Sequence, residues 1–159
     1  MTNIQTHEVK QKLQNTIFNI SRTQPFFSNV LQCLEIQYSD VTVPTAGVCF
    51  NKSRKKWELV INPNFFCNEL NDLEREAVLI HEIYHITHNH IFRSNFMTAT
   101  PEKRQILNIA MDMAINQYIP NIPKMAINVE NFKDDDGTPW EKHQSYEYYY
   151  KKLKENAEK

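Results

Sequence analysis

Two histidines and a glutamate stand in a pattern that can activate water. Residues 81–85 read His81-Glu82-Ile83-Tyr84-His85, the pattern H-E-x-x-H. An α-helix advances about 100° per residue, so positions four apart lie on one face. His81 and His85 could therefore bind one metal ion, and Glu82 could contact a water molecule held by that metal. Two imidazoles on zinc with a neighbouring carboxylate as general base form an arrangement that hydrolyses peptide bonds.

The segment around the pattern is expected to be helical on independent grounds. It contains no Gly or Pro from Asp72 to His90, and apolar residues recur along it. Asn71, followed three residues later by Glu74, resembles a capping box. The sequence therefore predicts a helix that begins near Asp72. The alternative for the pattern itself is a solvated helix that carries two incidental histidines.

A catalytic zinc site usually has three protein ligands and one open position, so a third ligand is needed. His88 is the nearer candidate, but on a straight helix it lies about 10 Å along the axis from His81, which is too far for one ion. Families with a third histidine just past the motif turn the chain back at a glycine. Glycine occurs here only at positions 47 and 137. We therefore interpret His88 and His90 as surface groups or as partners outside the ligand set.

Asp112 is the better candidate because of the segment in which it lies. Residues 108–116 are apolar except for Asn108, Asp112 and Asn116, which are spaced by four. This spacing places one polar stripe on an otherwise apolar helix, and a buried carboxylate is costly unless it is paired or binds a metal. The alternative is that the stripe faces solvent. We predict that Asp112 is the third zinc ligand and that one of the two asparagines could orient an imidazole.

The elements that must position these residues indicate an α+β fold, mostly helical, with a small sheet before the H-E-x-x-H helix. Helices are expected over residues 6–20, 25–34, 101–118 and 146–155. Residues 34–38 and 41–43 look extended, and residues 46–50 and 57–61 are predicted to pair as a hairpin. The clustered tyrosines near residue 148 are expected to pack in the core. Residues 134–137 are expected to form a solvated turn rather than a calcium site.

Length and composition exclude several classes of protein. A chain of 159 residues is expected to form one domain, 1–159. A net charge of −1 gives no electrostatic footprint for nucleic acid. No apolar run has the length of a membrane span, and the polar N-terminus does not resemble a signal peptide. Cys33, Cys49 and Cys67 lack C-x-x-C spacing, so we expect reduced thiols in a cytoplasmic protein. The oligomeric state is left open.

Several separated segments resemble the metallopeptidase domain found at the N-terminus of bacterial von Willebrand factor A-like proteins. The matching segments are 25–27, 45–46, the strand that ends at 61–63, 81–88, 108–116 and 145–150. The resemblance implies a zincin-like fold with His81, His85 and Asp112 as zinc ligands and Glu82 as general base. No segment of these 159 residues resembles the von Willebrand factor-type half. A short domain of this kind is similar to versions carried by tailed phages.

The function that follows is a zinc-dependent metallopeptidase acting on a protein or peptide substrate. Zinc would lower the pKa of its bound water, and Glu82 would take the proton and pass it to the leaving amine. A strand of the hairpin, at either 46–50 or 57–61, could hold the substrate by strand addition. One alternative is a non-catalytic binding module with a structural metal, for which His88 or Cys67 could fill a fourth position. Another alternative keeps the chemistry but changes the substrate to a non-peptide amide.

Overall fold

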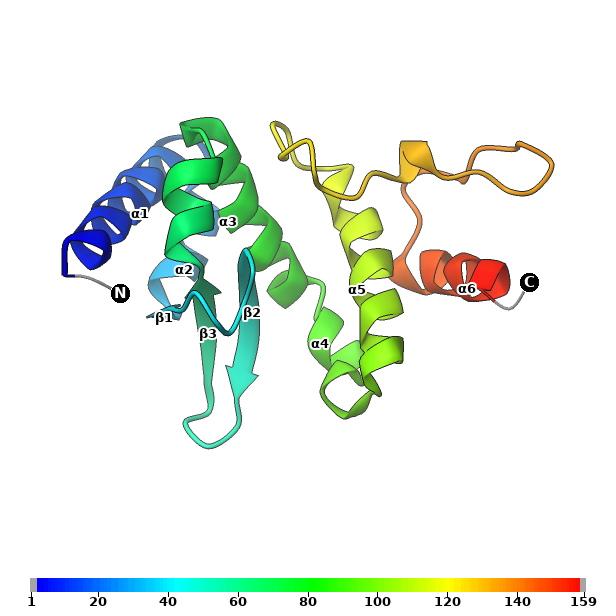
Figure 1. Cartoon of the computed structure of the whole chain (residues 1–159), viewed down its shortest axis with the longest axis horizontal. Coiled ribbons are helices and arrows are strands. Elements are labelled where there is room, and N and C mark those ends of the chain that lie inside the picture. Colours follow the sequence, from blue (N-terminus) through cyan, green and yellow to red (C-terminus); the bar gives the residue numbers. More distant parts are fainter. Residues whose placement is uncertain (1–2, 158–159) are drawn as a thin grey trace. The chain divides into compact units, whose positions relative to one another are not determined.

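The computed structural model describes residues 3–157 and has an α+β fold with a small mixed sheet (Figure 1). The chain packs as two compact units that divide between Tyr84 and His85. The helix that carries the H-E-x-x-H pattern, α3 (Asp72–Thr87), runs through this division. One continuous helix therefore belongs to both units, and the prediction of a single domain stays a prediction.

The first unit begins with two helices, α1 (Asn3–Thr23) and α2 (Pro25–Gln32), which pack against each other. Among the α1 side chains from His7 to Thr23, the buried ones are Val9, Leu13, Thr16 and Ile20. Their spacing of three and four residues places them on one face, as expected for a helix with one side in the core. Pro25 occupies the start of α2, where its missing N–H is not needed. Both helices were predicted, and both predictions are confirmed.

Three strands form the sheet of this unit, in the order β1-β3-β2. They are β1 (Glu35–Tyr38), β2 (Ala46–Asn51) and β3 (Lys56–Ile61). The predicted hairpin is confirmed, since β2 pairs antiparallel with β3, and β1 pairs parallel with β3. The central position of β3 corrects one expectation: residues 57–61 do not form an edge strand, whereas β2 does.

Residues 41–43 bend instead of extending, and this prediction was wrong. The hydroxyl oxygen of Ser39 accepts hydrogen bonds from the backbone N–H groups of Val41 and Thr42, at 3.3 and 2.9 Å. A serine hydroxyl that bonds nearby backbone in this way competes with strand pairing. The strand propensity of Val41 and Val43 was therefore outweighed by the local hydrogen bonds of Ser39.

The register of the hairpin decides which backbone groups of β2 point away from β3. The N–H of Asn62 donates to the carbonyl of Thr45 at 2.8 Å, just beyond the paired residues. Hydrogen-bonded and non-hydrogen-bonded pairs alternate in an antiparallel ladder. Gly47 and Cys49 therefore bond to β3, and the peptide groups of Ala46, Val48 and Phe50 are directed to the outer edge of β2.

A short π-helix, η1 (Phe65–Glu69), precedes α3 and was not predicted. Arg75 of α3 is buried, and its Nε donates to the carbonyl oxygen of Phe66 at 2.8 Å. The guanidinium thus donates to a buried backbone carbonyl of the π-helix. The predicted capping box is confirmed: the N–H of Asn71 donates to Glu74 Oε2 at 2.9 Å, and the N–H of Glu74 donates to Asn71 Oδ1 at 3.0 Å.

The second unit is helical, and its longest helices, α5 (Pro101–Asn116) and α6 (Tyr146–Ala157), pack together. Thr100 caps α5, since its side chain accepts from the N–H of Lys103 at 3.3 Å. Shorter elements are α4 (His90–Arg93), η2 (Phe96–Thr98) and η3 (Val129–Asn131). The core includes Met111, Met113, Trp140, Tyr146 and Tyr149, which confirms the packing role predicted for the clustered tyrosines.

Residues 134–137 form the expected turn. The N–H of Gly137 donates to the carbonyl of Asp134 at 2.9 Å, and Gly137 has a φ of 84°, which glycine adopts without strain. The Asp134 carboxylate accepts from Lys152 Nζ at 2.7 Å and from Trp140 Nε1 at 2.9 Å. Asp134 therefore ties the turn to α6. Within residues 3–157 no helix combines the length and the apolar character that crossing a membrane requires.

Candidate metal site

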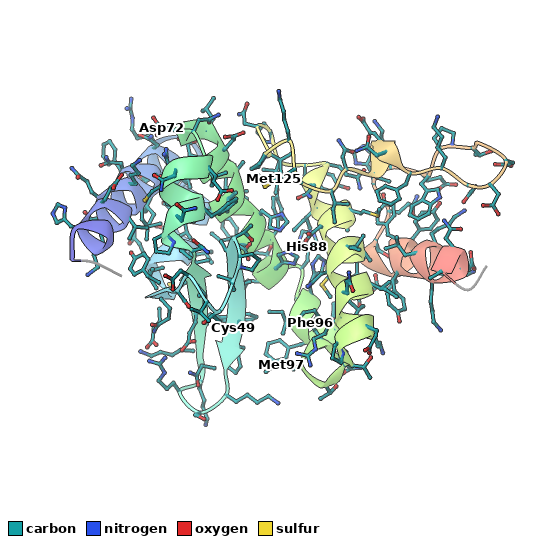
Figure 2. All side chains as sticks on the ribbon, in the orientation of Figure 1. Cys49, Asp72, His88, Phe96, Met97 and Met125 are labelled. Carbon is teal, nitrogen blue, oxygen red and sulfur yellow. The ribbon has the colours of Figure 1, made fainter. Side chains whose placement is uncertain are left out.

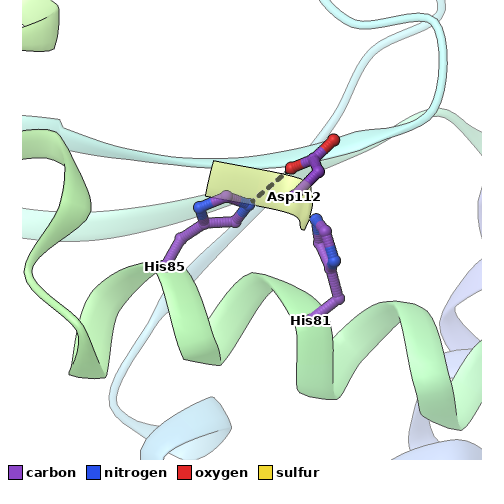
Figure 3. Close-up of side chains that lie close together, drawn as sticks. All are labelled: His81, His85 and Asp112. Atoms are coloured by element: carbon purple, nitrogen blue, oxygen red, sulfur yellow. Dashed lines mark ion pairs between the residues drawn. The ribbon is translucent and has the colours of Figure 1, made fainter. Parts of the chain in front are cut away.

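His81 and His85 lie one turn apart on α3, and both side chains are half-buried. Their relative position is set by the helix itself, because α3 is continuous through the division between the two units. Figure 3 shows the two imidazoles rising from the same face of this helix. The helical prediction for this segment is confirmed, and with it the shared face of the two histidines.

Asp112 of α5 meets the imidazole of His85. Its Oδ1 lies 3.3 Å from His85 Nε2, and their side chains are 28% and 13% exposed (Figure 3). One ligand atom from each of His81, His85 and Asp112 can be chosen so that all three lie within 4.8 Å of one another. The structure thus brings together the three residues that the sequence predicted as ligands, and the group could hold a metal ion.

Glu82 is buried on α3, with 6% of the residue exposed. Its Oε2 accepts a hydrogen bond from the backbone N–H of Val48, at 3.0 Å. That N–H belongs to the outer edge of β2, so the edge strand holds one oxygen of the carboxylate. On a helix Glu82 is about 60° from His85 around the axis, which places it beside the two histidines rather than behind them.

His88 and His90 depart from the straight helix that the sequence analysis expected. α3 ends at Thr87, and Asn89 adopts the left-handed conformation with a φ of 54° and a ψ of 34°. Asparagine tolerates this region better than other residues with a side chain. The chain therefore turns without a glycine, and the expectation of a straight helix through His88 was wrong. His88 is exposed just past the end of α3 (Figure 2) and is outside the group of three.

His90 is almost fully buried, at 1% exposure, and it is not a surface group. Its Nδ1 lies 3.1 Å from Nδ1 of His85. Burial, together with the neighbouring His85, His88 and Arg93, lowers the pKa of His90 to about 3. A buried imidazole is disfavoured in its charged form, so His90 is neutral at physiological pH. Sequence analysis placed His90 outside the ligand set but did not identify its contact with His85.

The polar stripe of α5 becomes more buried from its first residue to its last. Asn108 is exposed, Asp112 is half-buried and Asn116 is buried. The Asn116 Nδ2 donates to the carbonyl oxygen of Ile127 at 2.8 Å. The alternative that the whole stripe faces solvent is therefore wrong, while an orienting role for either asparagine stays a prediction.

The three cysteines are free thiols, as expected. Cys33 and Cys49 are exposed, with Cys49 on β2 (Figure 2), and Cys67 is buried. Burial raises the pKa of the Cys67 thiol. Metals bind the thiolate form, so this environment does not favour Cys67 as a ligand.

Comparison with protein families agrees with this site. Residues 8–158, nearly the whole chain, match the model of the family described as "Putative metallopeptidase domain". The chain belongs to this family. No curated protein and no solved structure matches it. Membership of the metallopeptidase family and the His/His/Asp group together indicate a metal cofactor, and a peptidase domain implies protein or peptide substrates.

Proposed function

We propose that the protein is a zinc-dependent metallopeptidase in which His81, His85 and Asp112 hold zinc and Glu82 is the general base. The observation that carries this proposal is that two histidines and a buried glutamate of α3 lie together, and that Asp112 of α5 completes the His/His/Asp group. A structural ion pair between His85 and Asp112 would need neither His81 beside it nor a carboxylate one residue further along the helix.

The donor set fits zinc. Imidazole nitrogens and carboxylate oxygens bind zinc at 2.0–2.2 Å, so two ligand atoms of one tetrahedral ion lie about 3.4 Å apart. The 3.3 Å between His85 Nε2 and Asp112 Oδ1 agrees with that separation. Three protein ligands leave one tetrahedral position for water or substrate, which is the pattern of catalytic rather than structural zinc sites.

Glu82 supplies the proton transfers. Zinc, when bound, would polarise the scissile carbonyl and acidify a water molecule. Val48 N–H holds Oε2 of Glu82, and we assign Oε1 as the atom that accepts the proton of the attacking water. As the water oxygen bonds to the carbonyl carbon and the C–N bond breaks, Glu82 delivers that proton to the departing amine nitrogen.

The edge strand offers a place for an extended substrate. The outward peptide groups of Ala46 and Phe50 flank Val48, whose N–H already bonds Glu82. A peptide that pairs with this edge would run past the general base, as strand addition requires only backbone groups. Ala46→Pro removes an outward N–H without a ladder bond to β3. We expect it to raise KM and to leave kcat within about twofold; an unchanged KM would exclude this placement.

The experiment compares wild type with Glu82→Gln. Protein purified without chelator is assayed for zinc by elemental analysis and for cleavage of a peptide library by mass spectrometry. We expect about one zinc per chain, lost in His81→Ala and His85→Ala. Glu82→Gln should keep zinc and circular dichroism but lose cleavage, since glutamine cannot accept the proton. Glu76→Gln, on the same helix, is the matched control and should cleave like wild type.

Each outcome is decisive. A wild type without any first-row metal would refute the metal site. A Glu82→Gln variant that cleaves at the wild-type rate would refute the assignment of the general base. A wild type that binds zinc but cleaves no member of the library would favour the alternative, a metal-stabilised binding module.

A further inference from the structure

The least expected feature of the site is a second imidazole behind the first. We propose that His90 is a positioning residue whose Nδ1 accepts a hydrogen bond from Nδ1–H of His85, which keeps the Nε2 lone pair of His85 directed at the metal position. This inference rests on the proposed function, because it assigns His90 its role through a ligand of the zinc.

The tautomers that the two imidazole rings must adopt support this assignment. The two Nδ1 atoms are 3.1 Å apart, so one of them donates and the other accepts. His85 Nε2 faces Asp112 Oδ1 at 3.3 Å and is the nitrogen available to a metal shared with Asp112. A neutral imidazole that binds metal through one nitrogen carries its proton on the other. In the metal-binding form the proton therefore sits on His85 Nδ1, and His90 Nδ1 is the acceptor.

His90 is held firmly enough to orient a neighbour. Its ring packs at 5.3 Å from the rings of both His85 and Tyr146, with interplanar angles of 68° and 69°. Its carbonyl oxygen accepts from Ser94 Oγ at 2.6 Å, and it is 1% exposed. Immobile partners of this kind fix the tautomer and the ring orientation of a metal-binding histidine.

The path of the chain is what makes the contact possible. On a continuous helix a residue five positions on is rotated by about 140°, so His90 would face away from His85. The left-handed backbone of Asn89 interrupts the helical path, and α4 begins at His90 in a new direction. A buried histidine in a core would also need a polar partner, but here the partner is the second nitrogen of a proposed ligand.

Three substitutions separate positioning from simple packing. In His90→Asn the side-chain carbonyl can take roughly the place of Nδ1 and still accept a hydrogen bond. In His90→Leu the volume is similar but no acceptor remains. In His90→Gln the amide reaches past that place, so the variant is polar and misplaced. Zinc affinity is measured for each by competition with a chromogenic chelator, and folding is checked by circular dichroism.

We expect His90→Leu and His90→Gln to lose about 10- to 100-fold in zinc affinity, as removal of a ligand's hydrogen-bond partner usually does, and His90→Asn to stay within about threefold of wild type. Imidazole ¹⁵N shifts of zinc-loaded wild type should show the His85 proton on Nδ1. If His90→Leu unfolds, His90→Gln against His90→Asn still gives the comparison.

The experiment distinguishes a wrong role for His90 from a wrong proposed function. Wild type that binds zinc, with all three variants equal to it, would overturn the role of His90 and leave the proposed peptidase intact. A His85 that binds zinc through Nδ1 would also overturn it. Wild type that binds no zinc would refute the proposed function and this inference together.

Discussion

Removing the Asp112 carboxylate gives two very different expected effects, because the residue has one role with metal and another without it. In the metal-free protein its Oδ1 lies 3.3 Å from His85 Nε2, a contact that is an ion pair when His85 is protonated, and the Asp112 and His85 side chains are 28% and 13% exposed. Pairs that keep some solvent contact contribute about 1 kcal/mol or less. As a zinc ligand, by contrast, it should exceed the 10- to 100-fold contribution of an outer hydrogen-bond partner.

Asp112→Ala should therefore lower zinc affinity by more than about 100-fold, or about 2.7 kcal/mol. The free energy of unfolding of the metal-free protein should fall by only about 1 kcal/mol. Affinity is measured by competition with a chromogenic chelator, and stability by urea unfolding after chelation. His88→Ala is the matched control, since His88 is exposed and outside the group of three, and it should bind zinc within about threefold of wild type.

The result that would refute this reasoning is a loss of less than about tenfold in Asp112→Ala, or equal losses in Asp112→Ala and His88→Ala. Asp112 would then be an ion-pair partner and no ligand. A large loss of stability in metal-free Asp112→Ala would refute the expected effect on folding. The contact between Asp112 and His85 would then stabilise the fold more than its partial exposure allows.

Substitutions at three further positions test the elements around the site. Asn89→Ala should destabilise by about 1 kcal/mol and Asn89→Gly should not, because Asn89 is left-handed; urea unfolding that ranks alanine above glycine would contradict this. Asn71→Ala removes the capping bond to the N–H of Glu74 and should cost about 1 kcal/mol in thermal or urea unfolding, unless the cap is unimportant to α3. Tyr149→Phe should cost about 1–3 kcal/mol, since the fully buried hydroxyl donates to the carbonyl of Glu141; a variant as stable as wild type would show that bond to be dispensable.

The parts of the fold that sequence predicted well are those fixed by local rules. The capping box at Asn71 and the Thr100-Pro101 start of α5 need only residues within one turn, and both occur as predicted. The hairpin of β2 and β3 follows from two β-rich runs around a polar loop. The order of the strands in the sheet was not predictable in this way. β1 pairs parallel with β3, and no local sequence pattern predicts which strands pair in parallel.

In the candidate site, too, local rules predicted some features and non-local contacts decided the others. Spacing alone placed His81 and His85 on one face, since a helix has a fixed pitch. The meeting of Asp112 with His85 required a judgement about burial, namely that an isolated carboxylate on an apolar helix needs a partner. The bond from Val48 N–H to Glu82 could not be read at all, because backbone groups carry no sequence signature and the register of β2 decides which of them point outward.

The end of α3 shows why a rule about one residue type misled. The lack of a glycine near His85 predicted a straight helix with no obvious means to turn the chain back, yet left-handed backbone is also open to asparagine. Among the described residues, three of the five non-glycine positions with positive φ are asparagines: 89, 95 and 121. In a chain with only two glycines, asparagine takes over these turns. The turn at Asn89 brings His90 against His85, so one left-handed residue accounts for the contact that a straight helix would not allow.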